Sequence, residues 1–310
     1  MNEKIDIDAG KTKNQLAVIR KAVFENLMEG FVPFPINRKA CAEWAKGLDI
    51  PRNGNVILYT SYMYQLASLF RQYEGIVARV GRLAGVKPLS GIGRLIVRPD
   101  RAEMDRAGKI LSGISSLLKE AGTDFSYLYD EEPYSGAILL ELGMLQEFRS
   151  YGKKLSGFLE SRGIRTVITV DPHTLNALSR LREMSLLGAE VKSYLEIIKL
   201  RPSNGRGNAY VLHDSCLYSR YLGMGGIIRK CLGDAGVELK EDEIVTGLRT
   251  SMCCGAPVGA VNRALSDRIA GMRVRSLKTV SENILVACPL CYQNLSKHSD
   301  RVADIMEVIA

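Results

Sequence analysis

Residues 283–291 read NILVACPLC, a short apolar run that leads directly into two cysteines. The run up to Ala287 is largely apolar and partly β-branched, which predicts a buried strand. Cys288 and Cys291 then follow at C-x-x-C spacing. Two thiolates at this spacing can bind one iron or zinc ion from a single turn. We therefore expect a metal site at the carboxyl end of this strand.

Three further cysteines extend the motif to C-x36-C-C-G-x32-C-P-L-C. The motif lies within the last third of the chain and holds five of the seven cysteines of the whole sequence. They are Cys216, which follows a predicted strand at Asn208–His213, and the adjacent pair Cys253 and Cys254. Neighbouring side chains diverge, so both members of the pair bind easily only if they reach different metals or one of them bridges. The pattern favours a polynuclear iron–sulfur centre over a single zinc ion.

The C-terminal half alternates predicted strands and helices. Helices are expected at Leu222–Leu232 and Val258–Met272, and Glu243–Leu248 is expected to form a short strand or the approach to Cys253. Alternation of this kind indicates a largely parallel sheet. Open α/β sheets place their sites beyond the carboxyl ends of the strands, so the three cysteine groups should converge there.

The first half repeats this plan without the cysteines. Strands are predicted at Asn55–Thr60 and Arg165–Val170, and helices at Tyr64–Ala84 and Ala102–Ala121. The positions that correspond to the five cysteines are occupied by Tyr62, Tyr134, Ser135, Asp171 and Thr174. These side chains cannot together hold the same sulfur-ligated centre. We interpret the chain as an internal duplication in which the first copy lacks every ligand.

This interpretation predicts an α/β protein of two pseudo-repeated lobes, each a small, mostly parallel sheet flanked by helices. Residues 1–53 should form an N-terminal helical extension. Residues 54–200 should form the lobe without ligands, and residues 201–310 the lobe that binds the cluster. The Gly-rich stretch Arg201–Gly207 is expected to be the loop that introduces the second lobe.

The flanks of the cysteines resemble a known family. Residues 210–216 (YVLHDSC) are similar to its YHDPC signature, and residues 252–257 (MCCGAP) and 286–292 (VACPLCY) are similar to its other two. This family is the CCG cysteine-rich domain of heterodisulfide reductase catalytic subunits. Relatives are found in anaerobic glycerol-3-phosphate dehydrogenase and in the iron–sulfur subunits of glycolate and lactate oxidases. The first lobe then resembles a degenerate CCG copy.

The resemblance implies a [4Fe-4S] cluster held by Cys216, Cys253, Cys254, Cys288 and Cys291, which takes a non-cubane form in the reductase branch. It also implies a subunit of a heterodisulfide-reductase-like complex that exchanges electrons with a disulfide, a thiol or a sulfur carrier. A ferredoxin-like iron–sulfur subunit and a flavoprotein subunit would be its partners. Two alternatives remain open: a pure electron-transfer subunit of a glycolate, lactate or glycerol-3-phosphate system, and an assembly module with structural zinc.

The bulk composition describes a globular protein of 310 residues, 46% hydrophobic and 25% charged. No apolar run of about 18 residues predicts a membrane span. The N-terminus lacks a secretory pattern, and the cysteines fit a reducing compartment, so we expect a cytoplasmic protein. The net charge of +8 is spread along the chain, with small groups such as Arg273, Arg275 and Lys278. We interpret it as solvated surface without nucleic-acid binding, or alternatively as a face for an acidic partner.

The remaining candidate residues have simpler interpretations. Cys41 and Cys231 are expected to be buried apolar side chains. His213 is expected either to hydrogen-bond near the cluster or to be structural. The others are His173, expected to be structural or a helix cap, His298, expected at the surface, and Tyr218 and Tyr292, expected to pack over the site.

Overall fold

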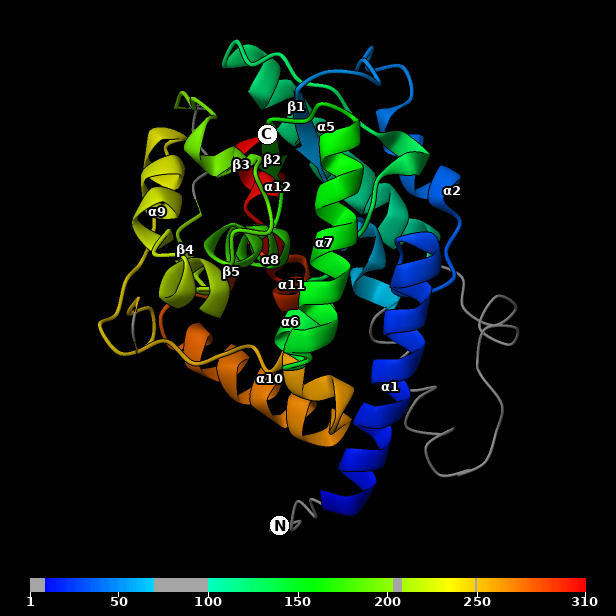
Figure 1. The fold of residues 1–310 in the computed structure, drawn as a ribbon. Coiled ribbons are helices and arrows are strands. Elements are labelled where there is room, and N and C mark those ends of the chain that lie inside the picture. The colour runs from blue at the N-terminus through cyan, green and yellow to red at the C-terminus, as the bar shows by residue number, and fades with distance from the viewer. Residues whose placement is uncertain (1–8, 70–99, 203–207, 249) are drawn as a thin grey trace.

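Two three-stranded parallel sheets form the centre of the protein, with helices on their outer faces (Figure 1). The computed structural model describes residues 9–69, 100–202, 208–248 and 250–310. The first sheet has the order β1-β2-β3 and the second β4-β5-β6. The expected α/β class and the two pseudo-repeated sheets are therefore confirmed.

The strands are short and lie in equivalent order in the two sheets. Their bounds are β1 Val56–Tyr59, β2 Thr166–Thr169, β3 Glu190–Ser193, β4 Tyr210–Leu212, β5 Asn283–Val286 and β6 Val302–Asp304. Each central strand pairs with its neighbours on both sides, as in the register Val211↔Ile284 and Ile284↔Val302. Because all pairs are parallel, the carboxyl ends of the strands in each sheet lie along one edge.

The helices cover the outer faces and the space between the sheets. Their bounds are α1 Ala9–Gly30, α2 Arg38–Ala42, α5 Arg101–Glu120, α6 Ala137–Glu141, α7 Leu145–Ser161, α8 Pro172–Glu183, α9 Gly225–Asp234, α10 Arg263–Lys278, α11 Pro289–Leu295 and α12 Met306–Ile309. Residues 63–69 are also helical. A π-helical segment spans Cys216–Tyr221, and 3₁₀ segments include Ala256–Ala260. Figure 1 shows α1 beside α7, where Arg20 pairs with Glu147.

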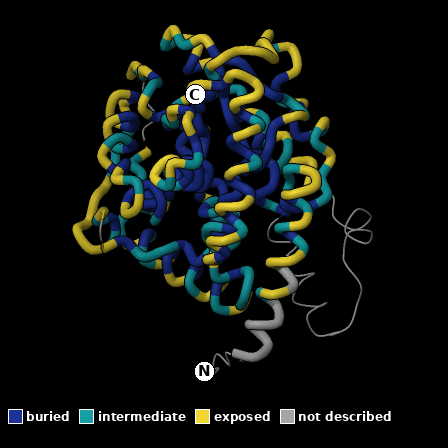
Figure 2. Tube along the Cα trace, in the orientation of Figure 1, coloured by how far each residue is buried: buried dark blue, intermediate teal, exposed yellow. Residues whose placement is uncertain are grey.

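Alternate side chains of each central strand enter different apolar cores, as the two-residue period of a strand requires. In β5, Ile284 and Val286 pack in an outer core with α10 and α11, whereas Leu285 points the other way. Leu285 shares a central core with Ile168 of β2 and with helix α5. This core therefore belongs to both sheets. Figure 2 shows the buried residues concentrated in the interior, where the strands lie.

Local features repeat between the two halves, as expected for a duplication. Strands β1 and β4 each form an additional isolated parallel bridge, Ile57 with Ser126 and Tyr210 with Leu239. Gly136 and Gly255 both adopt left-handed backbone conformations, with φ of 83° and 84°. The alignment of Tyr134-Ser135-Gly136-Ala137 with Cys253-Cys254-Gly255-Ala256 thus has a structural counterpart.

The structure corrects several predicted elements. Of the two alternatives for residues 243–248, the strand is wrong: they form turns on the approach to Cys253, because Asp242 and Thr246 bind the local backbone. Helix α10 starts at Arg263, later than predicted, because Asn262 caps it after the 3₁₀ segment. The predicted helix Tyr64–Ala84 is helical at 63–69, and its remainder lies outside the described residues. Strands β3 and β6 had not been predicted.

Candidate metal centre

The centre forms at the edge where β4 and β5 end. Cys216 starts the π-helical segment four residues after β4, and Cys288 is the cap residue of α11 two residues after β5. Since β4 and β5 are adjacent and parallel, their two cysteines meet at the same edge. π-Helical turns are rare and frequently occur at functional sites.

The structure brings all five predicted cysteines together. The thiol of Cys253 is hydrogen-bonded to the thiols of Cys216 and Cys254. The thiol of Cys291 is hydrogen-bonded to those of Cys254 and Cys288. The five sulfur atoms thus form one unbroken series: Cys216, Cys253, Cys254, Cys291 and Cys288. Cys254, Cys288 and Cys291 are buried, whereas Cys216 and Cys253 are half-buried, so one end of the series faces the surface.

Gly255 fixes the turn that carries the adjacent pair. Its φ of 84° lies in the left-handed region, which side chains with a Cβ rarely adopt. A Cβ at this position would lie 2.9 Å from Cβ of Ile269 and from the carbonyl oxygen of Ser266. Its backbone N–H also donates to Sγ of Cys253 at 3.4 Å. The glycine therefore sets the direction of both cysteines and supplies a donor to one of them.

The thiols cannot all ionise without a cation. Hydrogen bonds from Cys216 and Cys254 lower the pKa of Cys253. Hydrogen bonds to neighbouring thiols and burial raise the pKa of Cys254 and Cys291 well above the ordinary value. The pKa of Cys288 is also lowered, so Cys253 and Cys288 ionise first and force their neighbours to keep protons, because like charges repel at this distance. A metal group that neutralises several thiolates removes this conflict, so the donor set fits an iron–sulfur cluster or zinc.

A buried arginine and a histidine from the second lobe line the site. Arg273 of α10 is 1% exposed, and its Nε donates to Nδ1 of His213 at 3.0 Å. Burial lowers the pKa of Arg273 to about 10, so it stays charged at neutral pH. Burial, together with Arg273, lowers the pKa of His213 to about 3, which keeps the ring neutral. The prediction that Arg273 belongs to a solvated basic group is therefore wrong.

These two side chains present free donors beside the thiols. A ring nitrogen of His213 lies within 4.8 Å of the sulfurs of Cys254 and Cys291. Because Nδ1 of His213 accepts from Arg273, the proton of the neutral ring is on Nε2. His213 Nε2 and Arg273 Nη2 are buried and have no hydrogen-bond partner within the described residues. Unpaired buried donors require an acceptor, which the sulfurs of an anionic cluster would provide.

His173 reaches the centre from the first lobe. Its Nε2 lies 3.2 Å from Sγ of Cys288, and its Nδ1 lies 2.5 Å from Oε1 of Glu141. Burial alone would lower its pKa, but Glu141 and Cys288 raise it well above the ordinary value. The cap of α8 is Asp171, which accepts from the backbone of His173 and Thr174. The expectation that His173 is a structural or capping residue thus missed its contact with Cys288.

Other first-lobe counterparts of the cysteines bind one another or the backbone. The hydroxyl of Tyr62 donates to the Glu132 carbonyl at 2.7 Å, and that of Ser61 donates to Ser135 at 2.9 Å. Glu132 itself is buried and accepts from the backbone and hydroxyl of Thr60.

Cys41, Cys231 and His298 lie where the sequence predicted them, whereas the packing of Tyr218 and Tyr292 over the site stays a prediction. Cys41 and Cys231 are buried in apolar cores, and burial raises the pKa of Cys41 to about 12. His298 is exposed and pairs with Asp267 at 3.2 Å. Tyr218 is fully buried, and the half-buried ring of Tyr292 lies under the guanidinium of Arg106 at 3.2 Å.

Comparison with known families identifies the second lobe. Residues 210–296 match the cysteine-rich domain family known as CCG. This part of the chain is a CCG domain. Its limits include all five clustered cysteines and both strands, β4 and β5, that position them.

The chain is also similar to larger redox proteins. The chain is 28% identical to the probable iron–sulfur-binding oxidoreductase FadF of Bacillus subtilis, and the match covers 66% of this chain and 32% of that protein. It is 28% identical to the EtfAB:quinone oxidoreductase of Syntrophomonas wolfei over the same shares. It is 27% identical to a probable membrane-anchored ferredoxin of Chromohalobacter salexigens, covering 66% of this chain and 34% of that one. The chain thus spans about a third of the length of these curated relatives.

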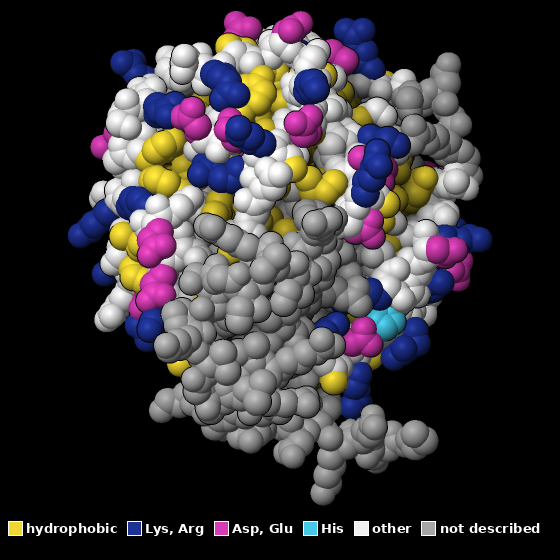
Figure 3. All heavy atoms as spheres, turned by 90° about the vertical axis from the view of Figure 1, so that its right-hand side faces the viewer, with side chains coloured by type: hydrophobic (Ala, Val, Ile, Leu, Met, Phe, Trp, Pro, Cys, Tyr) yellow, Lys and Arg dark blue, Asp and Glu magenta, His cyan; other side chains and the backbone are white. Residues whose placement is uncertain are grey.

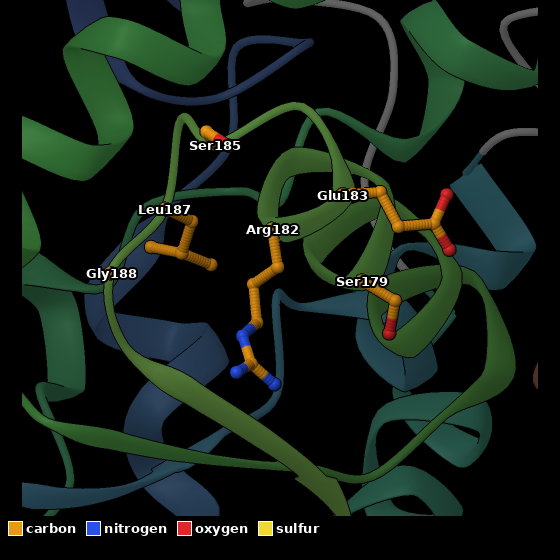
Figure 4. Close-up of a pocket in the computed structure, with 6 residues that line it drawn as sticks. All are labelled: Ser179, Arg182, Glu183, Ser185, Leu187 and Gly188. Carbon is orange, nitrogen blue, oxygen red and sulfur yellow. The ribbon is translucent and has the colours of Figure 1, made fainter.

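One surface pocket among the described residues lies outside the CCG domain and away from the centre. A pocket of about 580 Å³ lies at the end of α8 and the loop that follows (Figure 4). It is lined by Ser179, Arg182, Glu183, Ser185, Leu187 and Gly188. Arg182 is nine residues from His173, about 13 Å along the helix axis. On the described part of the face in Figure 3, Lys and Arg are interspersed with Asp and Glu.

The helices of the described residues include none with the length and hydrophobicity that crossing a bilayer requires.

Proposed function

We propose that this chain binds one iron–sulfur cluster through Cys216, Cys253, Cys254, Cys288 and Cys291 and acts as an electron-transfer subunit of an oxidoreductase complex. The observation that carries the proposal is the unbroken series of contacts among the five thiols beyond β4 and β5. Matches to iron–sulfur-binding oxidoreductases support the same conclusion.

The directions of the adjacent cysteines favour a polynuclear cluster over zinc. The thiols of Cys253 and Cys254 contact each other, and each also contacts a further thiol, Cys216 and Cys291 respectively. A single tetrahedral zinc takes four ligands, which would leave one of five contacting thiols without a metal. We propose a [4Fe-4S] cluster in the five-cysteine, non-cubane form. Bound there, the cluster would supply one-electron exchange. Gly255, Arg273 and His213 would stabilise its negative charge through hydrogen bonds and a buried cation.

The half-buried end of the series suggests where electrons pass. Cys216 and Cys253 are more exposed than the other three cysteines, so a partner or substrate would approach at their side. The first lobe offers no second set of sulfur ligands, so two clusters cannot flank a disulfide within these residues. For this reason we prefer electron transfer to heterodisulfide reduction as the proposed function.

A thiol or disulfide substrate remains the second candidate, because Cys216 and Cys253 are partly exposed beside the proposed cluster.

We further propose a ferredoxin-like iron–sulfur protein and a flavoprotein as partners, and a cytoplasmic location. The relatives cover about three times the length of the match, which allows further redox groups to be carried outside this stretch of sequence. We keep residues 54–200 and 201–310 as the proposed lobes.

The first experiment is the measurement of iron, acid-labile sulfide and zinc per chain after anaerobic purification, with EPR on the same sample. About four irons and four sulfides, with an atypical paramagnetic signal, are expected for a non-cubane cluster. Zinc without sulfide would overturn the proposal and make the second lobe a structural module.

A second measurement separates the two candidate functions. The reduced protein is mixed with a low-molecular-weight disulfide, and the oxidation of its cluster is followed optically. An electron-transfer subunit should react slowly with the disulfide and rapidly with a protein electron acceptor. Rapid, stoichiometric formation of thiol from the disulfide would favour the second candidate instead.

A further inference from the structure

The histidine that touches the centre comes from the lobe without ligands. His173 occupies the third position of Asp171-Pro172-His173-Thr174, the first-lobe counterpart of Cys288-Pro289-Leu290-Cys291. It lies 115 residues from Cys288 in sequence, yet its Nε2 is 3.2 Å from that sulfur. The contact joins the two copies of the duplication at their equivalent helix starts, α8 and α11.

Three restraints hold this ring in place. Asp171 accepts hydrogen bonds from the backbone N–H groups of His173 and Thr174, at 2.8 and 2.9 Å, which fixes the first turn of α8. Pro172 lies at the start of α8, where its ring fixes the backbone dihedral angle φ. Glu141, at the end of α6, binds Nδ1 at 2.5 Å and sets the rotation of the ring. The His173 side chain is only 6% exposed.

The two partners of the ring are both hydrogen-bond acceptors once a metal is bound. A carboxylate only accepts, and a metal-bound thiolate has no proton to donate. Nδ1–H therefore donates to Glu141, and Nε2–H donates to Cys288. At 3.2 Å the nitrogen is at hydrogen-bond distance from the sulfur. The ring thus acts on the ligand Cys288.

His213 provides a contrast within the same site. Its Nδ1 accepts from Arg273 of its own lobe, and among the described residues no carboxylate bonds to the ring. The first lobe therefore contributes the donor His173, which is held by a carboxylate, Glu141. The second lobe contributes the donor His213, which is held by a cation, Arg273. The two histidines approach different cysteines: His213 approaches Cys254 and Cys291, and His173 approaches Cys288.

We propose that His173, anchored by Glu141, is a positioning residue that donates an N–H···S hydrogen bond to Cys288 and thereby raises the reduction potential of the cluster. This inference rests on the proposed function. The first lobe then supplies the hydrogen-bonding environment of the one centre in place of a second cluster. Hydrogen bonds to cluster sulfurs favour the reduced, more negative state, which is why they raise the potential.

The test compares reduction potentials of purified full-length variants by EPR-monitored redox titration at one pH. His173→Leu removes the donor at similar volume, and His173→Gln restores an N–H that can reach the sulfur. His298→Leu, a histidine on the surface, is the matched control. We expect His173→Leu to lower the one-electron reduction constant about tenfold, which is about 59 mV. His173→Gln should lower it less, and His298→Leu should leave it unchanged.

Glu141→Leu is the second variant, for the case in which His173→Leu retains too little iron to titrate. It keeps the His173 donor but removes the carboxylate that holds it, so we expect the reduction potential to fall by less than in His173→Leu. An unchanged reduction potential in His173→Leu would overturn the inference. If His173→Leu cannot be titrated, an unchanged potential in Glu141→Leu would overturn it. Equal shifts in the Leu and Gln variants at position 173 would also overturn it, because a purely structural role predicts no rescue.

Iron and sulfide in the wild-type protein separate this inference from the proposed function. If the wild type binds no iron–sulfur cluster, both fail. If it binds the cluster and the variants keep its potential, only the role of His173 fails.

Discussion

Gly136 and Gly255 adopt the same left-handed conformation, with φ of 83° and 84°, at equivalent positions of two lobes that differ in every metal ligand. Gly136 follows Tyr134 and Ser135, whereas Gly255 follows Cys253 and Cys254. The backbone of the ligand turn is therefore retained where the ligands are not. The turn therefore belongs to the fold and does not depend on the cysteines.

Replacement of Gly255 by alanine should disrupt both the fold and the centre. The left-handed conformation and the contacts at 2.9 Å with Ile269 and Ser266 should cost roughly 1–3 kcal/mol of unfolding free energy. Urea unfolding and iron content measure the two effects. Gly136→Ala is the control, because its Cβ would meet Tyr151 at 2.9 Å in the other lobe. It should lose similar stability and keep more iron per folded chain. Equal iron losses would contradict this prediction.

Cys254→Ser should abolish cluster assembly or change its EPR spectrum, because this thiol links Cys253 to Cys291. Cys41→Ser should leave iron, sulfide and spectrum intact, since Cys41 lies in an apolar core around α1, α7 and β1. Metal analysis and EPR of both variants provide the comparison. Similar effects of the two substitutions would show that the ligand assignment is wrong.

Arg273→Met should weaken the cluster-bound protein more than the metal-free protein. In the metal-free state the loss of two hydrogen bonds, to His213 and to the carbonyl of Val245, is partly offset by removal of a buried charge. In the bound state the substitution also removes the cation beside an anionic group. We expect faster iron release to a chelator, measured against the matched surface variant Arg275→Met. Equal release rates in these two variants would contradict a charge-neutralising role.

Glu132 should make metal-free protein less stable as pH rises. Burial raises the pKa of Glu132 from its ordinary value of 4.5 to about 8. The folded state therefore binds a proton that the unfolded state has released between these two values. Unfolding free energy should fall as pH increases through this window. Glu132→Gln, which has no such proton, should show a flatter dependence in urea unfolding at pH 5, 6.5 and 8. A wild-type slope equal to that of the variant would exclude this carboxyl as the cause.

The convergence of the five cysteines was largely predictable because chemistry and topology agreed. Cys216 and Cys288 follow apolar runs, and parallel strands deliver their carboxyl ends to one edge. The duplication was detectable because Ser135 and Asp171 are spaced almost as Cys254 and Cys288 are. Strands β3 and β6 were missed because EVKS and VAD are short and partly polar, so pairing with β2 and β5 decides their conformation.

The surroundings of the centre were less predictable. The contact of His173 with Cys288 depends on how the two lobes pack, which local sequence does not encode. Arg273 lies among other basic residues and was interpreted as surface. A signal did exist, because Ala270, Val274 and Leu277 form a buried stripe on the same helix face. Arg273 falls within that stripe.

The central core, shared by Leu285 of β5 and Ile168 of β2, has a consequence for how the chain can be divided. The bond between the Tyr64 hydroxyl and Asp304, at 3.1 Å, crosses the same boundary. Excision of residues 1–200 would expose one face of the second sheet to water. The halves should therefore melt in a single cooperative transition, and the lobe without cysteines remains indispensable as a folding partner.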